Sequence, residues 1–327
     1  MRLALGFNPV LGISAAAAVA EKAEAAGYHS VWMHESLFQR DVVTYISAMA
    51  SATREIRIGS GAINTFTRHP VTAAATFASL SELSGGRVML GLGLGSFPTV
   101  PLLGYEIFPV EKSKPLKRVR EYIDVVRAVL NGGKVNFEGE FFRVRNLTLG
   151  FKPPAVVPIY VASLSPRIQA FAAEVADGVI LSPALTTAPG TQRMVSNVRA
   201  GEDRSGRTVE KASYMLTSID PDPTKAKEAV RDYYFFVYQL AEVVRPESLA
   251  PYGVKEETLA RVRDGYRAGD LSMAKKSIPE EAIEALTVAG DRDHAIERIR
   301  EYERSGVTLP ILMPIGNVEY AMSALAP

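Results

Sequence analysis

The 327-residue sequence contains no cysteine, so disulfides, thiolate metal sites and cysteine nucleophiles are all excluded. Glutamine occurs only at four positions, and together with the missing cysteine this scarcity leans towards a heat-adapted source. An excess of one charge is also missing, because 37 Lys and Arg face 36 Asp and Glu. Nucleic acid or an acidic membrane would need a clustered basic surface, so neither is an expected partner.

Long apolar runs are missing as well. The start, MRLALGFNPV, lacks the apolar stretch and small-residue cleavage site of a secretory signal. No later run approaches the roughly 20 apolar residues that span a bilayer. With 47% hydrophobic residues the chain can still bury a large core. We therefore expect a cytoplasmic protein, with no membrane contact, whose partner is a small-molecule substrate.

Strand-like and helix-like segments alternate along most of the chain, which is typical of βα units. Eight segments have the apolar character of buried strands, and eight parallel strands in a chain of this size favour a closed barrel over an open doubly wound sheet. We predict a single (β/α)8 TIM-type barrel domain over residues 1–327. The predicted strands are 2–7, 30–33, 56–62, 88–92, 159–162, 178–181, 212–219 and 309–313.

Two additions interrupt this rhythm. The segment KVNFEGEFFRVRNLTL, residues 134–149, predicts a small hairpin insertion that turns at Glu138-Gly139. Residues 224–305 predict a helical elaboration before the last strand, broken near Pro246, Pro251 and Gly269. Its aromatic stretch DYYFFVYQ, residues 232–239, is more typical of core or of a subunit contact than of a cofactor site.

Ligands of such barrels bind at the carboxyl ends of the strands, so we expect the widest cleft there, at strands one to five. GLGLGS, residues 91–96, lies at one of these ends. Its glycine spacing, and the prolines that follow, do not match a dinucleotide fingerprint. A crowded strand end and a surface for a ligand explain these glycines equally well.

The fifth strand runs into SLSPR, residues 163–167. Ser165 stands at an expected helix N-cap, Pro166 at the first turn and Arg167 beside it. A helix N-terminus attracts phosphate, but capping alone also accounts for Ser165 and Pro166.

Glu35 follows the second strand, where a carboxylate has few structural duties. It is a candidate catalytic acid, with an N-cap or an ion pair with Arg40 as the alternative. His69, before Pro70, is more typical of a cap or a packing residue than of a catalytic base. No spacing of His, Asp or Glu indicates a metal site, so we expect no metal.

The third strand ends in GSGAINTFTRHP, residues 59–70, where small residues let the backbone approach something else. In order along the chain, VWMHESLFQRD, IRIGSGAINTFTRHP, LSELSGGRVMLGLGLGS, VNFEGEFFRV, FKPPAVVPIYVAS and EVADGVIL resemble the bacterial-luciferase-like superfamily of barrel oxidoreductases. The sequence is most similar to its F420-dependent branch, typified by methylenetetrahydromethanopterin reductase.

The resemblance implies hydride transfer by coenzyme F420 in a homodimer. Two alternatives stay open: an FMN-dependent luciferase-like monooxygenase, and a barrel that binds F420 without turnover. The resemblance also implies a non-prolyl cis peptide at Gly61-Ala62 against the middle of the deazaflavin ring, and a coenzyme phosphate at residues 163–167. The cofactor-binding residues expected on this basis are Ser36, Gly61, Ala62, Asn64, Gly93, Ala162, Ser163, Ser165 and Arg167.

The sequence departs from the family pattern at three places. Glu35-Ser36 stands where the family usually has Asp-His, Gly6 where its reductase has Glu, and Pro101 where an acid is expected. Cofactor binding survives such changes more easily than the reaction does. With two acids replaced, proton delivery is expected from Glu35, from water or from a loop residue such as Glu106, and Glu35 is the candidate catalytic residue because it is the nearest to the deazaflavin face.

Overall fold

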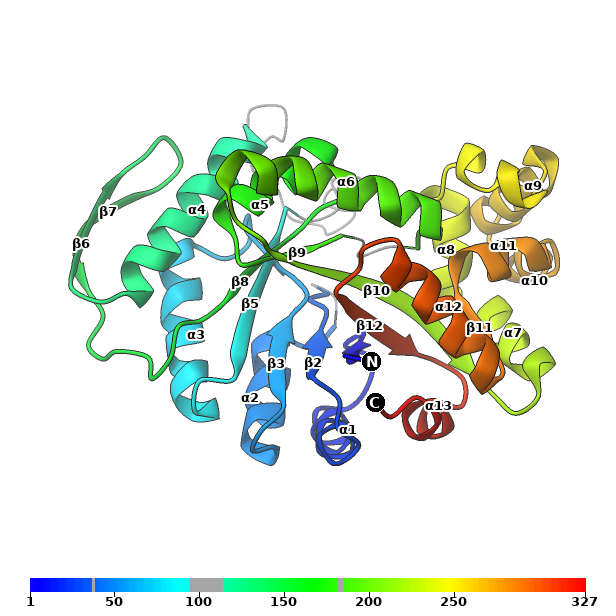
Figure 1. The fold of residues 1–327 in the computed structure, drawn as a ribbon, viewed down its shortest axis with the longest axis horizontal. Coiled ribbons are helices and arrows are strands. Elements are labelled where there is room, and N and C mark those ends of the chain that lie inside the picture. The colour runs from blue at the N-terminus through cyan, green and yellow to red at the C-terminus, as the bar shows by residue number, and fades with distance from the viewer. Residues whose placement is uncertain (37–38, 95–113, 182–184) are drawn as a thin grey trace. The chain divides into compact units, whose positions relative to one another are not determined.

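The structure is a computed structural model that describes residues 1–36, 39–94, 114–181 and 185–327. Pro101 and Glu106 therefore lie outside the described residues. Parallel strands alternate with helices, which is the pattern of a (β/α)8 barrel and confirms the predicted fold class (Figure 1). Its eight strand positions are β1 (Ala4–Phe7), β2 (Ser30–Met33), β3 (Arg57–Ser60) continued by β4 (Ile63–Asn64), β5 (Val88–Gly93), β8 (Ile159–Ala162), β9 (Gly178–Ile180), β10 (Glu210–Ile219) and β12 (Leu309–Pro314).

Helices follow most of these strands. They are α1 (Ile13–Ala25), α2 (Val42–Ala52), α3 (Pro70–Ser84), α4 (Pro115–Leu130), α5 (Pro166–Val175), α6 (Ala188–Ser205), α7 (Pro223–Asp232), α12 (Arg292–Arg304) and α13 (Val318–Ala324). Within the described residues, none of the helices combines the length and the apolar character that crossing a membrane requires.

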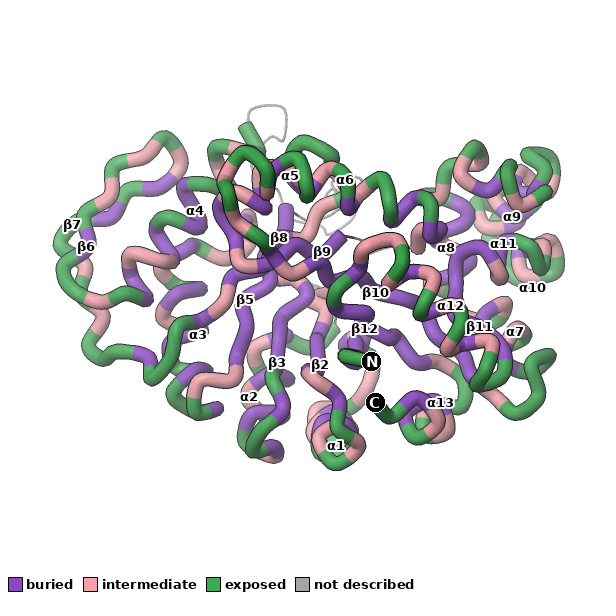
Figure 2. Tube along the Cα trace, viewed as in Figure 1, coloured by how far each residue is buried: buried purple, intermediate pink, exposed green. Residues whose placement is uncertain are grey.

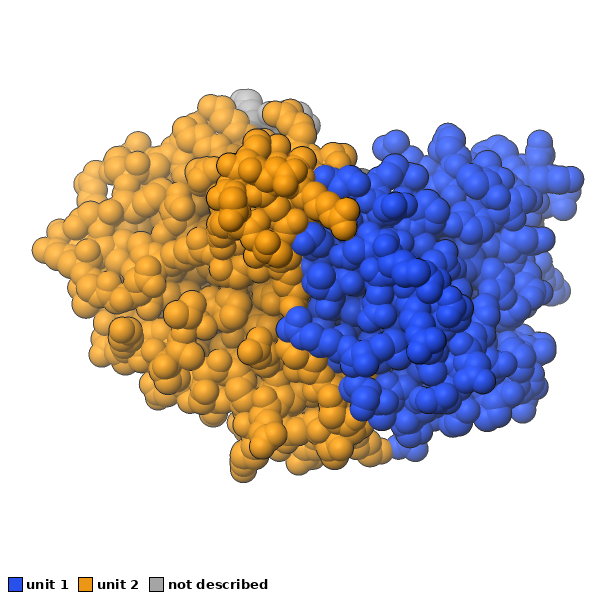
Figure 3. All heavy atoms as spheres, viewed as in Figure 1, with its two compact units in different colours: residues 1–5, 181–196, 211–327 blue, residues 6–180, 197–210 orange. Residues whose placement is uncertain are grey.

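Contacts between Cα atoms divide the chain into two compact units, coloured separately in Figure 3. The unit of residues 6–180 and 197–210 carries the parallel strands β2, β3, β5, β8 and β9 in that order. The unit of residues 1–5, 181–196 and 211–327 carries β10 between β11 and β12, with β12 pairing β1. A single domain over 1–327 stays a prediction.

Both predicted additions are present. The hairpin consists of β6 (Lys134–Glu138) and β7 (Arg143–Thr148), which pair antiparallel. The helical elaboration contains α8 (Tyr234–Glu242), α9 (Glu256–Arg267), α10 (Leu271–Lys276) and α11 (Glu280–Leu286). It ends in the short strand β11 (Val288–Gly290), which the sequence did not predict. The aromatic stretch contributes Phe236 to the core, whereas Tyr234 is exposed.

The strands are buried and the outer faces of the helices are exposed (Figure 2). Trp32 of β2, in the unit of residues 6–180 and 197–210, is fully buried. Its ring packs edge-on against that of Tyr160, with 5.0 Å between the ring centres, and its indole N–H donates to Ser30 Oγ at 2.9 Å. A Cβ at Gly59 would lie 2.4 Å from the Trp32 ring, so the large indole requires glycine on the next strand.

The start of α1 differs from the sequence pattern, whereas α2 has a side-chain cap of the expected type. Ser14 has the residue type of an N-cap, but the helix begins at Ile13 with Gly12 at the cap, so Ser14 lies inside its first turn. Asp41 caps α2 by accepting from the amides of Val43 and Thr44 at 2.9 and 3.2 Å.

Candidate active site

The carboxyl end of the third strand bulges away from its neighbour. A cis peptide bond joins Gly61 and Ala62, as predicted. Between the pairs Gly59–Met89 and Ile63–Leu92, the β3–β4 side contains one residue more than β5, which is the definition of a β-bulge. Ser60 fills the resulting gap in the ladder: its Oγ donates to Gly91 O at 2.9 Å and accepts from Gly91 N at 3.0 Å.

Three of the expected cofactor residues lie together beside this bulge. Gly93 ends β5 and pairs with Ala162, which ends β8. A Cβ built on Gly93 would lie 3.7 Å from the Cβ atoms of both Ala62 and Ala162, and 3.4 Å from Ala162 O. Ala62, Gly93 and Ala162 thus form a surface of minimal side chains at three strand ends, which we call the small-residue floor.

Gly91, two residues earlier, has a different reason to be glycine. A Cβ there would lie 1.9 Å from Ser60 O, a backbone atom that cannot give way without separating the strands. Close packing of the bulge accounts for Gly91. At Gly93 the same Cβ would make only ordinary van der Waals contacts, so packing does not require glycine there.

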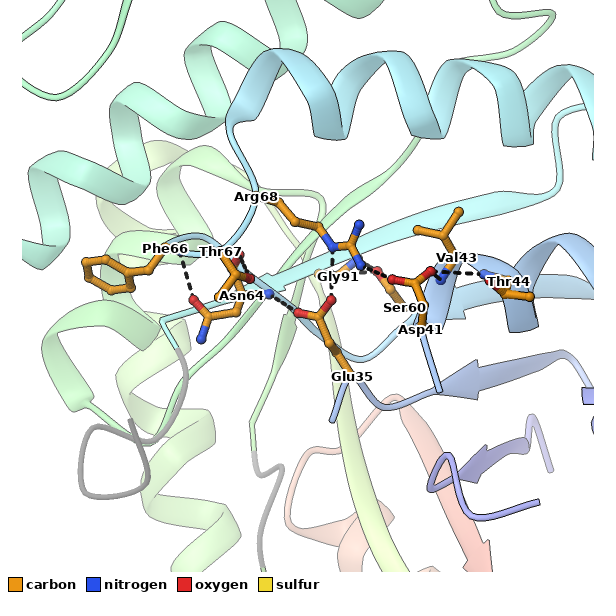
Figure 4. Close-up of polar contacts among 10 residues, drawn as sticks. All are labelled: Glu35, Asp41, Val43, Thr44, Ser60, Asn64, Phe66, Thr67, Arg68 and Gly91. Atoms are coloured by element: carbon orange, nitrogen blue, oxygen red, sulfur yellow. Dashed lines mark hydrogen bonds and ion pairs between the residues drawn. The ribbon is translucent and has the colours of Figure 1, made fainter. Parts of the chain in front are cut away.

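Glu35 holds the chain that leaves the bulge (Figure 4). Its Oε2 accepts from the Asn64 amide at 2.7 Å, and its Oε1 accepts from Arg68 Nε at 2.9 Å. The Glu35 side chain is only 5% exposed, and that of Arg68 is 23% exposed. Both carboxylate oxygens are therefore engaged with partners that belong to one segment, residues 64–68.

The partner of Glu35 is Arg68, not Arg40 as the sequence alternative had it. Arg40 donates to Val10 O at 3.3 Å. Arg68 also pairs with Asp41, the cap of α2. Burial acts to raise the pKa of Asp41, but the hydrogen bond and charge of Arg68 outweigh it and hold that pKa below its usual value. A buried carboxylate, a guanidinium and a helix cap form one chain of charges.

The segment between the bulge and α3 is fixed by its own polar groups. Asn64 Oδ1 accepts from Phe66 N at 2.8 Å, and Asn64 O accepts from Thr67 Oγ1 at 3.2 Å. His69 Nδ1 accepts from Val71 N at 3.3 Å, which makes it the N-cap of α3, as expected. Burial, with the nearby Arg118 charge, lowers the pKa of His69, which suits a neutral imidazole acting as an acceptor.

At the β8–α5 junction Ser165 occupies the N-cap position, but its side chain makes no capping hydrogen bond. Instead the Ser165 amide donates to Ser163 Oγ at 3.0 Å, and Gln169 Nε2 donates to Ser163 O at 2.9 Å. Arg167, at the start of the helix, is exposed. A capping hydrogen bond from the Ser165 side chain therefore does not explain the serine at this position.

Ser36 follows Glu35 and is partly exposed; its carbonyl accepts from Gln39 N at 3.0 Å. Among the residues that the structure describes, no group of three His, Cys, Asp or Glu side chains is arranged to hold a metal ion.

Two surface hollows lie near the amino ends of the strands, away from the carboxyl ends that carry the bulge. One of about 590 Å³ is lined by residues that precede β8, β9 and β10, including Val157, Asp177 and Arg207. A smaller one is lined by residues around Arg54 and Arg87. The carboxyl ends of the strands form the other rim. Residues 95–113, which follow β5 in the sequence, lie outside the described residues. The predicted cleft at that rim stays a prediction.

We predict that His34, next to Glu35, makes stability depend on pH. Burial lowers the pKa of His34 from 6.5 to about 4. Between these values the unfolded chain binds a proton that the folded chain does not, so the free energy of unfolding rises with pH in this window. At about 1.4 kcal/mol per pH unit, the loss on going from pH 6.5 to 4 is about 3 kcal/mol. Urea unfolding at several pH values measures it.

The variant is His34→Gln, which should flatten the pH dependence between 4 and 6.5 relative to wild type. Equal slopes in wild type and His34→Gln would contradict the prediction.

A family model described as luciferase-like monooxygenase matches residues 8–309, so the chain belongs to the luciferase-like monooxygenase family. Among curated relatives, the 5,10-methylenetetrahydromethanopterin reductase of Archaeoglobus fulgidus is 30% identical over 302 residues, which cover 90% of this chain and 88% of that one. The enzyme of the same name from Methanolobus tindarius is 30% identical over 325 residues, covering 97% and 95%. The F420-dependent glucose-6-phosphate dehydrogenase of Nocardia farcinica is 26% identical over 292 residues, covering 88% and 81%.

Solved structures share the fold over the whole chain. The coenzyme F420 dependent tetrahydromethanopterin reductase from Methanopyrus kandleri aligns with a TM-score of 0.88 at 24% identity, covering 99% of this chain and 97% of that one. An F420-dependent secondary alcohol dehydrogenase in complex with an F420-acetone adduct aligns with a TM-score of 0.79 at 20% identity, covering 99% and 97%. At these identities the likeness supports the (β/α)8 barrel.

Proposed function

We propose that this protein is an F420-dependent oxidoreductase that transfers a hydride between the deazaflavin and a carbon of a small substrate. The observation that carries the proposal is the small-residue floor, where Gly93 is not required by packing and two alanines flank it beside the Gly61-Ala62 bulge. A planar tricyclic ring needs such a flat surface at van der Waals distance. The printed names of F420-dependent relatives support F420 as the source of this ring.

When bound, F420 supplies the hydride chemistry at its C5 carbon, and the protein supplies orientation and a polar surrounding. The bulge and floor offer one face for the ring. Ser163, the α5 N-terminus and Arg167 offer a phosphate site directly after Ala162 of the floor, where the Ser165 side chain leaves the helix end uncapped. Ser36 follows β2 and Asn64 ends β4. These two residues complete the proposed cofactor-binding residues.

Glu35 was expected to act as a catalytic acid, and its contacts support a different task. Both its oxygens accept hydrogen bonds from the segment that leaves the bulge. We infer that Glu35 is a positioning residue that holds Asn64 and Arg68 relative to the floor. Proton delivery in the reaction then falls to water or to the substrate itself.

The substrate that we propose first is a methylene-pterin of the 5,10-methylenetetrahydromethanopterin type, because three relatives with 28–30% identity carry that reductase name. Gly6 and Pro101 stand where family acids are expected, so the test substrates include secondary alcohols as well. A homodimer and a cytoplasmic location belong to the same proposal. Sedimentation of the purified protein tests the first, and fractionation of the source cells the second.

The alternative is an FMN-dependent monooxygenase, which the family's description names. Absorption of the purified protein, followed by fluorescence titration with F420 and with FMN, separates the two. We expect F420 to bind more tightly. Equal or reversed affinities would move the protein to the flavin branch, and binding of F420 without turnover of any tested substrate would favour a non-catalytic binder.

Arg167→Ala should weaken F420 binding by roughly 10- to 100-fold, because a charge-assisted hydrogen bond to phosphate contributes about 1.5–3 kcal/mol. The measurement is the F420 dissociation constant. Ser36→Ala is the matched comparison, since a neutral hydroxyl contributes less, and we expect a change within a few fold. An unchanged dissociation constant in Arg167→Ala would remove this residue from the phosphate site.

A further inference from the structure

We propose that Arg118 of α4, clamped by the tip of the β6–β7 hairpin, is a positioning residue for the segment that leaves the bulge. The inference rests on the proposed function in so far as this segment faces the cofactor. Its consequence is that the hairpin insertion contributes to cofactor affinity without touching the cofactor.

Arg118 is surrounded by aromatic rings. Its guanidinium carbon lies 4.4 Å from the ring centre of Phe66, 5.0 Å from that of Phe142 and 5.5 Å from that of Phe141. Its Nη2 donates to Thr65 O at 3.3 Å. Phe66 and Thr65 belong to the segment after the bulge, whereas the other two rings belong to the hairpin tip. One side chain therefore joins two parts of the chain that are more than 70 residues apart.

The hairpin tip is itself fixed to α4 by Glu121. This carboxylate is 6% exposed. It accepts from the amides of Glu140 at 3.0 Å, Phe141 at 2.8 Å and Phe142 at 3.4 Å. A Cβ at Gly139 would lie 2.4 Å from Glu121 Oε2, so glycine at the turn is what admits the carboxylate. Three backbone hydrogen bonds to one buried acceptor hold the two phenylalanines rigidly in place.

Further contacts connect this clamp to the candidate active site. The Phe142 ring meets that of His69, the cap of α3, edge-on at 5.5 Å, and that of Tyr122 at 5.7 Å. The Phe66 amide donates to Asn64, whose own amide donates to Glu35. Arg118 thus contacts Thr65 and Phe66 of the same segment that Glu35 holds through Asn64 and Arg68.

The surroundings of Arg118 are not those of an ordinary structural ion pair. Among the described residues, no carboxylate lies within ion-pair distance of its guanidinium, and its Nε is buried without a hydrogen-bond partner. Burial lowers the pKa of Arg118, and the charge of Glu121 acts in the opposite direction. The rings of Phe141 and Phe142 face the same guanidinium as the Phe66 ring does, so Arg118 packs the hairpin tip and Phe66 into one cluster.

The test compares Arg118→Gln with Arg120→Gln. Arg120 lies on the same helix and its guanidinium packs over Phe171 at 4.7 Å, so this control also loses one cation–π contact. Hydrogen exchange measures the protection of the amides of residues 64–68. We expect Arg118→Gln to speed their exchange by roughly tenfold, the loss of about 1.4 kcal/mol of local stability, and Arg120→Gln to leave it unchanged.

The F420 dissociation constant is the second readout. Arg118→Gln should raise it by roughly tenfold, and its effect should not add to that of Glu35→Gln, because both act through one segment. The effects of Arg120→Gln and Glu35→Gln should add. Arg118→Lys should not rescue, since an ammonium cannot stack between rings as a planar guanidinium does.

The two proposals fail in different ways. If wild type does not bind F420, the proposed function fails, while the exchange measurement still decides whether Arg118 holds the segment. If exchange of residues 64–68 is the same in Arg118→Gln, Arg120→Gln and wild type, the positioning role of Arg118 is overturned. If exchange changes but the dissociation constant does not, the segment is held by Arg118 but does not serve the cofactor, and the inference is overturned as well.

Discussion

Glu35→Gln is expected to weaken F420 binding at least tenfold and to lower the free energy of unfolding by about 3 kcal/mol. Removing one partner of a buried ion pair costs about 3–5 kcal/mol, and the lower figure applies because Arg68 is 23% exposed and keeps Asp41 as a partner. Glutamine also presents an N–H to one of two donors, Arg68 Nε or the Asn64 amide, so one hydrogen bond must be lost. F420 titration and urea unfolding measure the two effects.

The same variant distinguishes positioning from acid catalysis. A general acid contributes a factor of about 10² to 10⁴ in rate, so loss of the acid would cut turnover by at least the lower figure while affinity stayed within a few fold. The geometry favours weakened affinity, because both carboxylate oxygens already accept hydrogen bonds. A variant that binds F420 like wild type and loses turnover would restore Glu35 as the catalytic acid.

Arg68→Met provides the partner experiment, with Arg40→Met as its control. Arg68→Met should reproduce the loss of affinity, and the double variant with Glu35→Gln should lose little more than either single variant. Arg40→Met should leave affinity unchanged, because Arg40 contacts Val10 O rather than Glu35. Additive losses from Glu35 and Arg68 would mean that the two residues act separately.

The contrast between Arg40 and Arg68 shows where sequence reasoning stops. A carboxylate directly after an apolar strand points to a barrel rim, and Glu35 lies at that position. Its partner is 33 residues away, and a contact of that separation depends on how the bulge turns the chain. No local pattern records that turn, so the nearest arginine in sequence was the natural but wrong candidate.

The strands were predictable because strands buried on both faces form short continuous apolar runs, and the helices because many of them are amphipathic. The cis bond at Gly61-Ala62 was predictable only through the resemblance, since small residues permit a close approach without specifying its geometry. Caps were the least predictable features: Ser14 lies within α1, and Ser165 occupies the N-cap position of α5 as expected but its side chain makes no capping hydrogen bond. A cap depends on backbone angles that tertiary packing decides.

The glycines of GLGLGS, which the sequence left open between packing and function, separate in the structure. Gly91 lies against a backbone carbonyl, and Gly93 lies beside two alanines with room for a methyl group. This difference leads to opposite expectations for two substitutions only two residues apart on one strand. Comparing substitutions at Gly91 and Gly93 therefore tests the small-residue floor on a single strand, β5.

Gly91→Ala should destabilise the protein by about 3 kcal/mol or more, because its Cβ would meet Ser60 O at 1.9 Å and overpacking of this kind forces the backbone to move. Gly93→Ala should leave the free energy of unfolding nearly unchanged, because its Cβ meets neighbours at 3.4–3.7 Å. Urea unfolding of both variants measures this contrast. Equal destabilisation would show that both glycines serve packing alone.

Gly93→Val should then reduce F420 affinity by about 100-fold, or about 2.7 kcal/mol, in a protein that still folds. Valine suits a strand end, and the two methyl groups beyond its Cβ would rise above the level of Ala62 and Ala162, where the ring is proposed to lie. Gly93→Ala raises the same surface by one methyl group and should lose a few fold. A graded loss from glycine to alanine to valine, measured by F420 fluorescence at constant fold stability, is what a flat binding surface requires. Wild-type affinity in Gly93→Val would place the deazaflavin elsewhere in the barrel and remove the floor as the basis of the proposed function.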